Sequence, residues 1–520
     1  MGRGTIAFFR QAGSGLMLKT DIRLLWVLGI TLLVKLAVAW FLPLIGDEAY
    51  FIIWGKHPDF GFYDHTPMVG WFLTAMLAVS DAAIWLRLPQ ILITSFIGWA
   101  IYLLVRRQDE TAALLVAMLY LLSPINILGV VITTDTPLLL WSFLSGLCFY
   151  YAQRDDNRYW YLLSGLFLGL AFFSKFFAGL LGVAYFIYIL LFVRRGLRPW
   201  LGLLWVIAGT LPFIGLNLWW NYIHCWNNYL FNLYNRTAGN VFSITLSLKY
   251  LAILVYLVTP PIVYYFVKQQ RELRHKLLND RYGVFIGLFL IPYGLFLLLS
   301  FWVSIGLHWL FSFYPFIFLG IAGIFSQQQL RRSFYFMLPF TLLHIALFGF
   351  LVVVSPGIFN TGIFKKDENH YKDVVYSMYG KEIVQKLRVY QPEFILATDS
   401  YTESALLSYA AREHIIVMGV GSHHARQDDM ITDFRKLDGK NILMVSYSPQ
   451  LEKYQKYFES AESKPLPIAE TTYHMLLGRG FNYQLYRETV IEQVLQRYYN
   501  IPDFLPVGRC NMHDWYGKPD

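Results

Sequence analysis

The residues best suited to chemistry gather in one segment, residues 46–67, which lies between two apolar stretches. Asp47 and Glu48 open this segment directly after the first apolar run, and Asp64 and His65 stand near its end. Carboxylates and imidazoles of this kind act as general bases, as orienting groups or as metal ligands. Because the segment is also rich in Tyr, Trp and Phe, an alternative interpretation is a helix at a membrane surface with ordinary solvated charges.

Further candidates stand at the ends of later apolar runs, where an ionisable group is costly unless it is paired or hydrated. Asp135 precedes Thr136-Pro137, so it could face a site or only cap a helix. Lys175 interrupts an apolar run and could snorkel to the interface, or it could supply positive charge to a phosphate, as could Arg236. Asn221 and His224 lie in an Asn- and Trp-rich segment that suits a sugar ring or a lipid headgroup equally well. His308 lies in a later turn.

The composition identifies the elements that must position these residues. Of the 520 residues, 56% are hydrophobic and only 15% are charged, whereas globular domains carry about 25% charged residues. We therefore expect an α-helical polytopic membrane protein with about 11 transmembrane helices and interfacial helices in the first loop. The first run is too long for a signal-peptide core, so it is expected to be retained. The predicted spans are residues 24–45, 85–105, 112–128, 137–152, 161–173, 177–193, 201–220, 250–267, 283–301, 309–325 and 334–354.

Lys and Arg are distributed unevenly among the segments that connect these spans. If the N-terminus is cytoplasmic, the inner segments hold eighteen of them and the short outer loops only four, namely Lys56, Lys175, Arg236 and Lys249. Positive residues accumulate on the cytoplasmic side of short loops. The pattern predicts an odd number of spans and an outer C-terminus, and it explains the net charge of +9 without nucleic acid.

After residue 355 the composition changes, because charged residues return and apolar runs shrink to strand length. We expect residues 1–355 to form the transmembrane domain and residues 356–520 a C-terminal, extracytoplasmic, soluble α/β domain. Strands are expected at 393–398, 415–419, 441–446 and 475–477, and helices at 404–412 and 450–457, which favours a partly parallel sheet.

The chain has three cysteines, Cys148, Cys225 and Cys510, and no disulfide framework is expected from them. A bridge between Cys225 and Cys510 is possible in an outer compartment, but their separation in sequence gives no geometry, so it is not favoured. The sequence contains no internal repeat, no Walker-type phosphate loop, no HExxH and no CxxC.

Several short passages, taken in order, resemble one family. They are Gly46-Asp47-Glu48-Ala49-Tyr50, Tyr63-Asp64-His65-Thr66-Pro67, Arg87-Leu88-Pro89, Thr134-Asp135-Thr136-Pro137, Ser174-Lys175, Trp220-Asn221 and His308-Trp309. In this series the chain resembles the C-type-fold membrane glycosyltransferases, in the superfamily of protein O-mannosyltransferases and lipid A aminoarabinose transferases (glycosyltransferase family 39-like). The resemblance reaches to about residue 325, and the C-terminal domain is similar to the outer domain of such enzymes only in position and class.

The resemblance implies an inverting glycosyltransferase at the outer face of the bacterial inner membrane. It would move a sugar from a polyprenyl-phosphate donor to a lipid (lipid A-like) or other envelope acceptor, which makes the donor, a lipid or protein acceptor and membrane lipids its partners. Asp47 would be the general base or the carboxylate that orients the acceptor, with Glu48 in support. Relatives that modify lipid A carry Lys and Pro where this chain has His65-Thr66, so this chain departs from their pattern there.

The departing phosphate needs positive charge, since it leaves as an anion. The predicted substrate- and phosphate-binding residues are Asp64, His65, Asp135, Lys175, Asn221, Arg236 and His308. A divalent metal held by Asp64, Asp135 or His224 is a further possibility, because a metal would also polarise the phosphate. No other cofactor is expected.

Three alternative functions remain open from the sequence. A protein O-mannosyltransferase-type activity differs only in its acceptor. A transporter or flippase of lipid-linked substrates would use similar charges, but such proteins commonly show paired halves and mid-membrane charges, which this sequence lacks. A sensor with a ligand-binding outer domain would not need so many spans.

Overall fold

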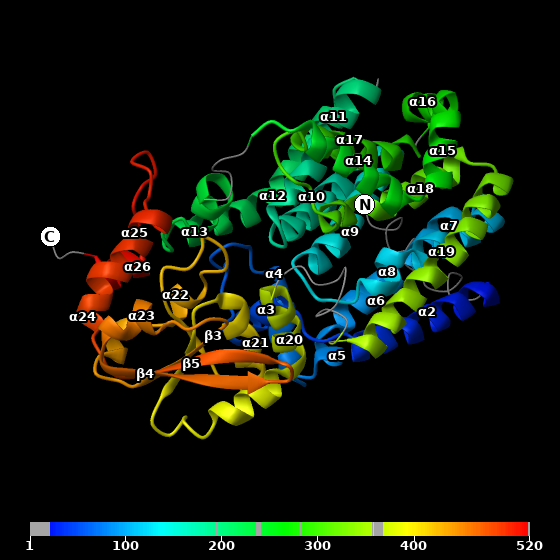
Figure 1. Cartoon of the computed structure of the whole chain (residues 1–520). Coiled ribbons are helices and arrows are strands. Elements are labelled where there is room, and N and C mark those ends of the chain that lie inside the picture. Colours follow the sequence, from blue (N-terminus) through cyan, green and yellow to red (C-terminus); the bar gives the residue numbers. More distant parts are fainter. Residues whose placement is uncertain are drawn as a thin grey trace.

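The computed structural model describes residues 21–193, 196–235, 241–280, 282–355, 357 and 368–517. The chain forms a bundle of apolar helices that carries a smaller α/β domain at one end (Figure 1). Helices suit apolar surroundings because all their backbone hydrogen bonds are made within the segment. The polytopic helical class predicted from composition is therefore confirmed.

The first half of the bundle contains the following helices, with α3 and α4 forming the loop after the first span. They are α2 (Ile22–Phe41), α3 (Gly46–Lys56), α4 (Met68–Leu77), α5 (Ala83–Leu86), α6 (Leu88–Val105), α7 (Glu110–Leu122), α8 (Pro124–Leu128), α9 (Asp135–Asp155), α10 (Arg158–Phe172), η1 (Phe176–Ala178) and α11 (Gly179–Phe192). The second half contains α12 (Arg198–Tyr222), α13 (Asn227–Tyr229), η2 (Leu230–Asn235), α14 (Ile244–Val258), α15 (Pro260–Lys268), α16 (Gln270–Asn279), α17 (Gly283–Leu299), η3 (Leu307–Phe313), α18 (Tyr314–Ile324) and α19 (Gln327–Val354).

Every apolar stretch predicted as a span is largely helical, but the number of complete spans is not settled by length. Among the described residues, five helices are long and apolar enough to cross a membrane, or up to seven if each of two bent helix pairs is one span. Shorter apolar helices, such as Glu110–Leu122, complete the bundle. The count of eleven stays a prediction.

The stretch predicted as a span at 250–267 is not one straight helix but two helices with a sharp bend between them, and its status as one span stays a prediction. Helices α14 and α15 meet at an angle of 99°. The break falls at Thr259, whose φ of 77° is not helical and which precedes Pro260. Proline lacks the N–H that a continuous helix requires and restricts the residue before it, so the helix ends there and a new one begins.

The C-terminal domain contains a five-stranded sheet with the order β2-β1-β3-β5-β4. Strand β1 is parallel to both β2 and β3, whereas β5 is antiparallel to β3 and to β4. The strands are β1 (Ile395–Thr398), β2 (Ile416–Val417), β3 (Ile442–Ser446), β4 (Phe458–Ile468) and β5 (Thr471–Phe481). The helices are α20 (Glu368–Leu387), α21 (Tyr401–Ala411), α22 (Asp428–Ile431), η6 (Phe434–Leu437), α23 (Leu451–Tyr454), η7 (Gln455–Tyr457), α24 (Tyr483–Tyr486), η8 (Arg487–Ile491), α25 (Glu492–Tyr498) and α26 (Asn511–Tyr516).

Strand β4 was not predicted, and the strand expected at 475–477 is the middle of the much longer β5. Strand β4 contains Pro465 and Pro467 and several charged residues, which are typical of an edge strand but weaken a sequence-based strand prediction. Strand β4 lies at the edge of the sheet and pairs with β5 alone. Its outer side has no neighbouring strand, so the missing N–H of a proline that faces outward costs no hydrogen bond of the sheet.

The first-loop helices and the C-terminal domain share one hydrophobic core. Buried side chains of α3, such as Ile52 and Trp54, belong to the same cluster as Val375 of α20, Leu406 of α21 and Leu443 of β3. Helices α3 and α4 lie between the bundle and the sheet (Figure 1). The C-terminal domain is therefore packed, through apolar contacts, directly on the first loop, which carries Asp47 and Asp64.

A disulfide bond joins the two parts of the chain as well. Cys225, which follows α12, is bonded to Cys510, which precedes α26, although the two are 285 residues apart in sequence. Beside it, the indole N–H of Trp226 donates to the Pro506 carbonyl at 2.9 Å. The expectation against this bridge is therefore wrong, because the fold brings together two thiols that are far apart in sequence.

Candidate functional site

The Asp47-Glu48 pair occupies the first turn of α3, where exposed backbone N–H groups favour negative charge. The first residue of this helix, Gly46, packs on α21, since a Cβ there would lie 2.2 Å from Thr402 Cγ2. The two carboxylates have different surroundings: Asp47 is accessible to solvent, whereas Glu48 is fully buried. Asp47 can therefore contact a substrate, whereas Glu48, its neighbour in sequence, cannot.

Glu48 is neutralised by Arg87, which lies between α5 and α6 and is also fully buried. The guanidinium donates to both carboxylate oxygens, from Nε at 2.8 Å and from Nη2 at 2.6 Å. Its remaining N–H groups bond to the carbonyls of Ala39, Leu42 and Pro43, at and just after the end of α2, at 2.7, 2.8 and 3.1 Å. Every donor direction is used, so the pair fixes α3 against the first span, and Glu48 has a positioning role.

Asp64, near the other end of the loop in sequence, is buried, with 7% of its surface exposed. The Tyr50 hydroxyl donates to its Oδ1 at 3.3 Å. Burial raises the pKa of this carboxyl to about 7, and the nearby negative charge of Asp47 acts in the same direction. Asp64 can therefore hold or release a proton near neutral pH.

Asp135 and Lys175 form a second buried ion pair. Lys175 Nζ lies 2.9 Å from each carboxylate oxygen of Asp135, and its charge also lies 5.3 Å from the ring centre of Phe177. The alternative in which Asp135 only caps a helix is wrong, since the N-cap residue is Thr134 and no side-chain cap bond forms there. Lys175 does not snorkel to an interface either, because it is buried.

These groups lie close enough to influence one another across three separate segments. The pKa of Asp47 is raised because the surrounding protein reduces its hydration, although part of its surface stays accessible, and the positive charge of Lys175 lowers this pKa in part. Asp47 in turn raises the pKa of Asp64. Within the described residues Asp47 has no hydrogen-bond partner, so the site combines an open carboxylate, a fixed ammonium group and a carboxyl that titrates near neutrality.

Asn221 belongs to a buried amide cluster that holds the first loop in place. Its side chain donates to the Asn217 carbonyl at 2.9 Å and accepts from the Asn228 backbone N–H at 3.0 Å. Asn228 Nδ2 then donates to the backbone carbonyls of Phe62, of Tyr63 at 3.2 Å and of His65 at 3.3 Å. The Asn-rich segment, which suggested sugar binding, positions the loop that carries Asp64.

The proposed metal set does not assemble in the part of the chain that the structure describes. His224 stacks on Trp220 with ring centres 4.4 Å apart, and its Nε2 lies 3.8 Å from Asp59. Both oxygens of Asp135 are bonded to Lys175. Among the described residues no three His, Cys, Asp or Glu side chains are grouped so as to hold a metal ion.

The remaining predicted residues have mixed positions. Arg236 lies outside the described residues. His65 lies among aromatic rings, 5.9 Å from Trp54 between ring centres. His308 is exposed at the start of η3, and the ring of its neighbour Trp309 lies 4.5 Å from Phe177, beside the Lys175 turn. The structure thus brings Asp47, Asp64, Asp135 and Lys175 together.

Sequence reasoning missed the residues by which the rest of the molecule supports this site. Arg87 was noted only as part of a family motif. An arginine between apolar residues is itself a sequence signal, because an arginine that becomes buried requires a carboxylate partner. Gln427 of the C-terminal domain accepts from the Tyr63 N–H at 2.8 Å and donates its own N–H to the Tyr50 hydroxyl at 3.2 Å. No pattern in a single sequence indicates such a contact.

Parts of the chain are similar in sequence to known glycosyltransferases. Residues 64–220 match the family described as dolichyl-phosphate-mannose-protein mannosyltransferase. The lipid A galacturonosyltransferase RgtD of Rhizobium johnstonii is 30% identical over 185 residues, which are 34% of this chain and 38% of that protein. The match therefore spans well under half the length of this relative.

The fold is similar to that of ArnT from Cupriavidus metallidurans. The apo crystal structure gives a TM-score of 0.59 at 14% identity, covering 87% of this chain and 97% of ArnT. The structure bound to undecaprenyl phosphate gives 0.61 at 13% identity, covering 88% and 98%. The predicted resemblance to the C-type-fold membrane glycosyltransferases is confirmed.

Proposed function

We propose, from the fold that this chain shares with the C-type membrane glycosyltransferases, that it moves a sugar from a polyprenyl-phosphate donor to a lipid A-like acceptor. The undecaprenyl phosphate bound to ArnT supports this class of donor. The lipid A substrate in the name of RgtD supports this class of acceptor, although the similarity covers only part of each chain. The alternative is a protein hydroxyl as acceptor, as in protein O-mannosyl transfer.

One observation carries the proposal: Asp47 is an open carboxylate beside a fixed ammonium group. A hydroxyl acceptor must lose a proton as it attacks the anomeric carbon, so a base within hydrogen-bond reach accelerates the step. Asp47 is solvent-accessible and has no hydrogen-bond partner among the described residues, so its oxygens can take up that bond. Attack on the face opposite the phosphate inverts the anomeric centre.

Lys175 stabilises the group that leaves. As the anomeric bond breaks, the donor becomes a polyprenyl phosphate anion, and a preorganised cation lowers the energy of that charge. Lys175 is held by Asp135 at 2.9 Å and does not have to be ordered during the reaction. An ammonium group has three donors, so it can bond to Asp135 and still donate to a phosphate oxygen.

Two observations support placing the end of the molecule that carries Asp47 and the C-terminal domain outside the cytosol. Disulfide bonds persist in oxidising compartments and are rare in the cytosol, and Cys225 and Cys510 lie at this end. The Lys and Arg residues favour the other end as the cytoplasmic one. We therefore propose that the C-terminal domain is extracytoplasmic, covering the catalytic loop of an enzyme of the bacterial inner membrane.

A divalent metal remains a separate prediction. Of the three residues in the predicted metal set, Asp135 is paired with Lys175 and His224 lies beside Asp59. Asp64 accepts a hydrogen bond from the Tyr50 hydroxyl and has no ion-pair partner among the described residues. Loss of transfer after chelation, with recovery on addition of Mg²⁺ or Mn²⁺, would support a metal. Transfer that is unchanged by chelation would exclude an exchangeable one.

The function is tested by comparing envelope lipids and glycoproteins of cells with and without the gene by mass spectrometry. We expect one class of envelope lipid to lose the mass of a single sugar when the gene is deleted, with the matching polyprenyl-phosphate sugar accumulating. A change confined to glycoproteins would move the acceptor to protein. Identical lipid and protein profiles in both strains would contradict the proposed function.

A further inference from the structure

The C-terminal domain contains a cavity of about 320 Å³, separate from the Asp47 loop in sequence but adjacent to it in space. The cavity lies where the chain leaves β1 and β2, and its lining includes Asp399, Ser400 and Tyr401 after β1, and Gly419, Ser422 and Arg426 after β2. Ligands of sheets with parallel strands bind outside the carboxyl ends of those strands. The volume lies at the lower end of the range of about 300–1,000 Å³ for small-ligand sites.

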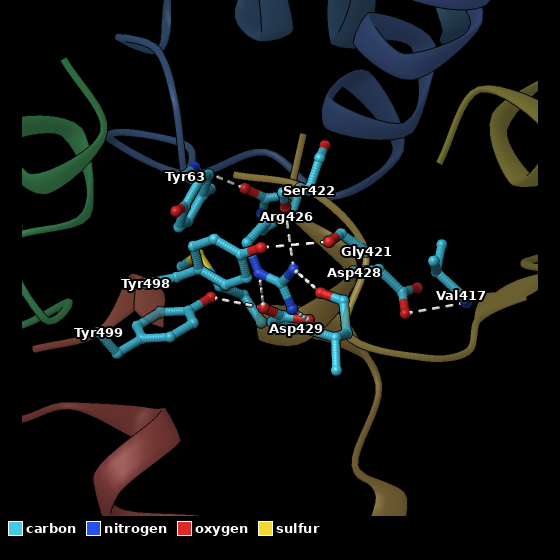
Figure 2. Close-up of polar contacts among 12 residues, drawn as sticks. Tyr63, Val417, Gly421, Ser422, Arg426, Asp428, Asp429, Tyr498 and Tyr499 are labelled. Atoms are coloured by element: carbon cyan, nitrogen blue, oxygen red, sulfur yellow. Dashed lines mark hydrogen bonds and ion pairs between the residues drawn. The ribbon is translucent and has the colours of Figure 1, made fainter. Parts of the chain in front are cut away.

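The loop after β2 is fixed by an extensive set of polar contacts (Figure 2). The Arg426 guanidinium bonds to Asp429 at 2.6 and 3.1 Å and to the carbonyls of Val420 and Ser422 at 2.7 and 3.0 Å. Tyr498 covers the guanidinium, whose carbon lies 4.4 Å from the ring centre. A cavity wall held by these contacts needs little further ordering to bind a ligand, so it is preorganised.

The chemistry of the lining selects the ligand. Asp399, Asp428 and Asp429 supply carboxylates, of which Asp429 is paired with Arg426 and Asp428 lies 2.6 Å from His414 Nε2. Arg426 is the one guanidinium or ammonium group in the lining, and His424 is its one imidazole. An excess of carboxylates repels a phosphate or a uronic acid. Carboxylates, serine hydroxyls and a tyrosine ring instead suit a ligand that presents several hydroxyl donors, and a sugar ring is such a ligand.

Tyr401 connects this cavity to the candidate active site. It is a wall of the cavity, its ring centre lies 5.6 Å from that of Tyr50, and the charges of Asp47 and Asp64 both act on its hydroxyl. The same loop after β2 contacts Tyr50 through the N–H of Gln427 at 3.2 Å. A ligand in the cavity therefore lies next to the loop that carries Asp47.

We propose that this cavity binds an uncharged, hydroxyl-bearing sugar ring of the acceptor and so presents a neighbouring acceptor group to Asp47. The inference rests on the proposed transfer function and gives the C-terminal domain a role in it, that of selecting the acceptor. The donor is bound elsewhere, so occupancy of the cavity affects acceptor binding and leaves donor binding unchanged.

The test uses the full chain in lipid nanodiscs, a labelled polyprenyl-phosphate sugar pool, and lipopolysaccharide from a strain that lacks the gene. Asp399→Asn removes a lining carboxylate, and Ser422→Trp places a bulky ring in the cavity from an exposed position. We expect the KM for lipopolysaccharide to rise at least about tenfold in each variant, with kcat and the slow hydrolysis of donor by water unchanged. The matched controls are Asp503→Asn and Ser463→Trp, both at exposed positions of the same domain outside the cavity lining.

A direct binding experiment separates this inference from catalysis. Saturation-transfer NMR with delipidated core oligosaccharide should show binding to wild type and to Asp47→Asn, and none to Ser422→Trp. Wild-type KM and undiminished oligosaccharide binding in both cavity variants would overturn the inference while leaving the transfer function standing. Absence of any transfer by wild type to this acceptor would instead contradict the proposed function, and the inference would fall with it.

Discussion

The guanidinium of Arg87 holds both carboxylate oxygens of Glu48, at 2.8 and 2.6 Å, in a pair that is completely buried one residue away from Asp47. This pair explains how adjacent acidic residues have different roles. Glu48 fixes the start of α3 against the end of α2, and Asp47 is thereby directed to solvent beside Lys175.

Arg87→Ala should destabilise the protein strongly, because it leaves the carboxylate of Glu48 buried without a partner. Breaking a buried pair in this way costs about 3–5 kcal/mol. The free energy of unfolding can be measured by SDS titration in mixed micelles. The matched control is Arg198→Ala, since the pair of Arg198 with Asp156 is exposed on both sides, and such pairs contribute at most about 1 kcal/mol. Equal losses in the two variants would contradict a stabilising role for the Glu48 pair.

Asp64→Asn should change how stability depends on pH. The folded-state pKa of Asp64 is about 7, whereas the unfolded value is near 3.9. Between these values the folded state binds more protons, so this group makes stability fall as the pH rises from about 4 to about 7, with no further change above. Unfolding temperature measured across this range should fall less in Asp64→Asn than in wild type. Identical slopes in wild type and Asp64→Asn would refute the assignment.

Lys175→Met should lower kcat, since the cation that meets the departing phosphate is lost. Removing one preorganised donor at a developing oxyanion typically costs about 10²–10³ in rate. The KM for the acceptor should stay near wild type in assays with labelled donor, because Lys175 acts on the donor side. Lys249→Met, at an exposed position at the start of α14, serves as the control. A rise in acceptor KM with unchanged kcat would remove Lys175 from the phosphate site.

Replacing Cys225 and Cys510 together by Ser should loosen the C-terminal domain from the bundle. A disulfide that closes a long loop contributes about 2–5 kcal/mol. Limited proteolysis should cut the C-terminal segment faster in the double variant, while Cys148→Ala, which alters the one buried free thiol, leaves the rate unchanged. If thiol labelling of the unfolded, unreduced protein finds three free cysteines, the bridge does not form in the cell.

Much of the bundle could be predicted from sequence, because a long apolar run requires a helix and leaves little choice of structure. The four residues that meet at the candidate site, Asp47, Asp64, Asp135 and Lys175, could be selected from the sequence because ionisable groups are rare in apolar surroundings. Their pairing was not predictable, since Lys175 meets Asp135 across 40 residues.

The C-terminal domain was harder to predict because its decisive contacts are long-range. The edge strand β4 carries prolines that argue against a strand in isolation, and the Cys225–Cys510 bridge and the Gln427 contacts with Tyr50 and Tyr63 depend on how the domain packs on α3. Asn221 was misleading for a related reason. Its amide looks like a sugar ligand in sequence, but it is used to hold a neighbouring loop.

The most direct test of the central claim is the rate of sugar transfer by Asp47→Asn in nanodiscs, with Asp59→Asn as the matched control from the same loop. Asparagine keeps the shape of the side chain but is a far weaker base, so transfer should fall by about 10²–10⁴. Unfolding temperature should be unchanged, because Asp47 has no hydrogen-bond partner among the described residues. Asp59→Asn should retain wild-type turnover. Near wild-type transfer by a folded Asp47→Asn enzyme would contradict the account.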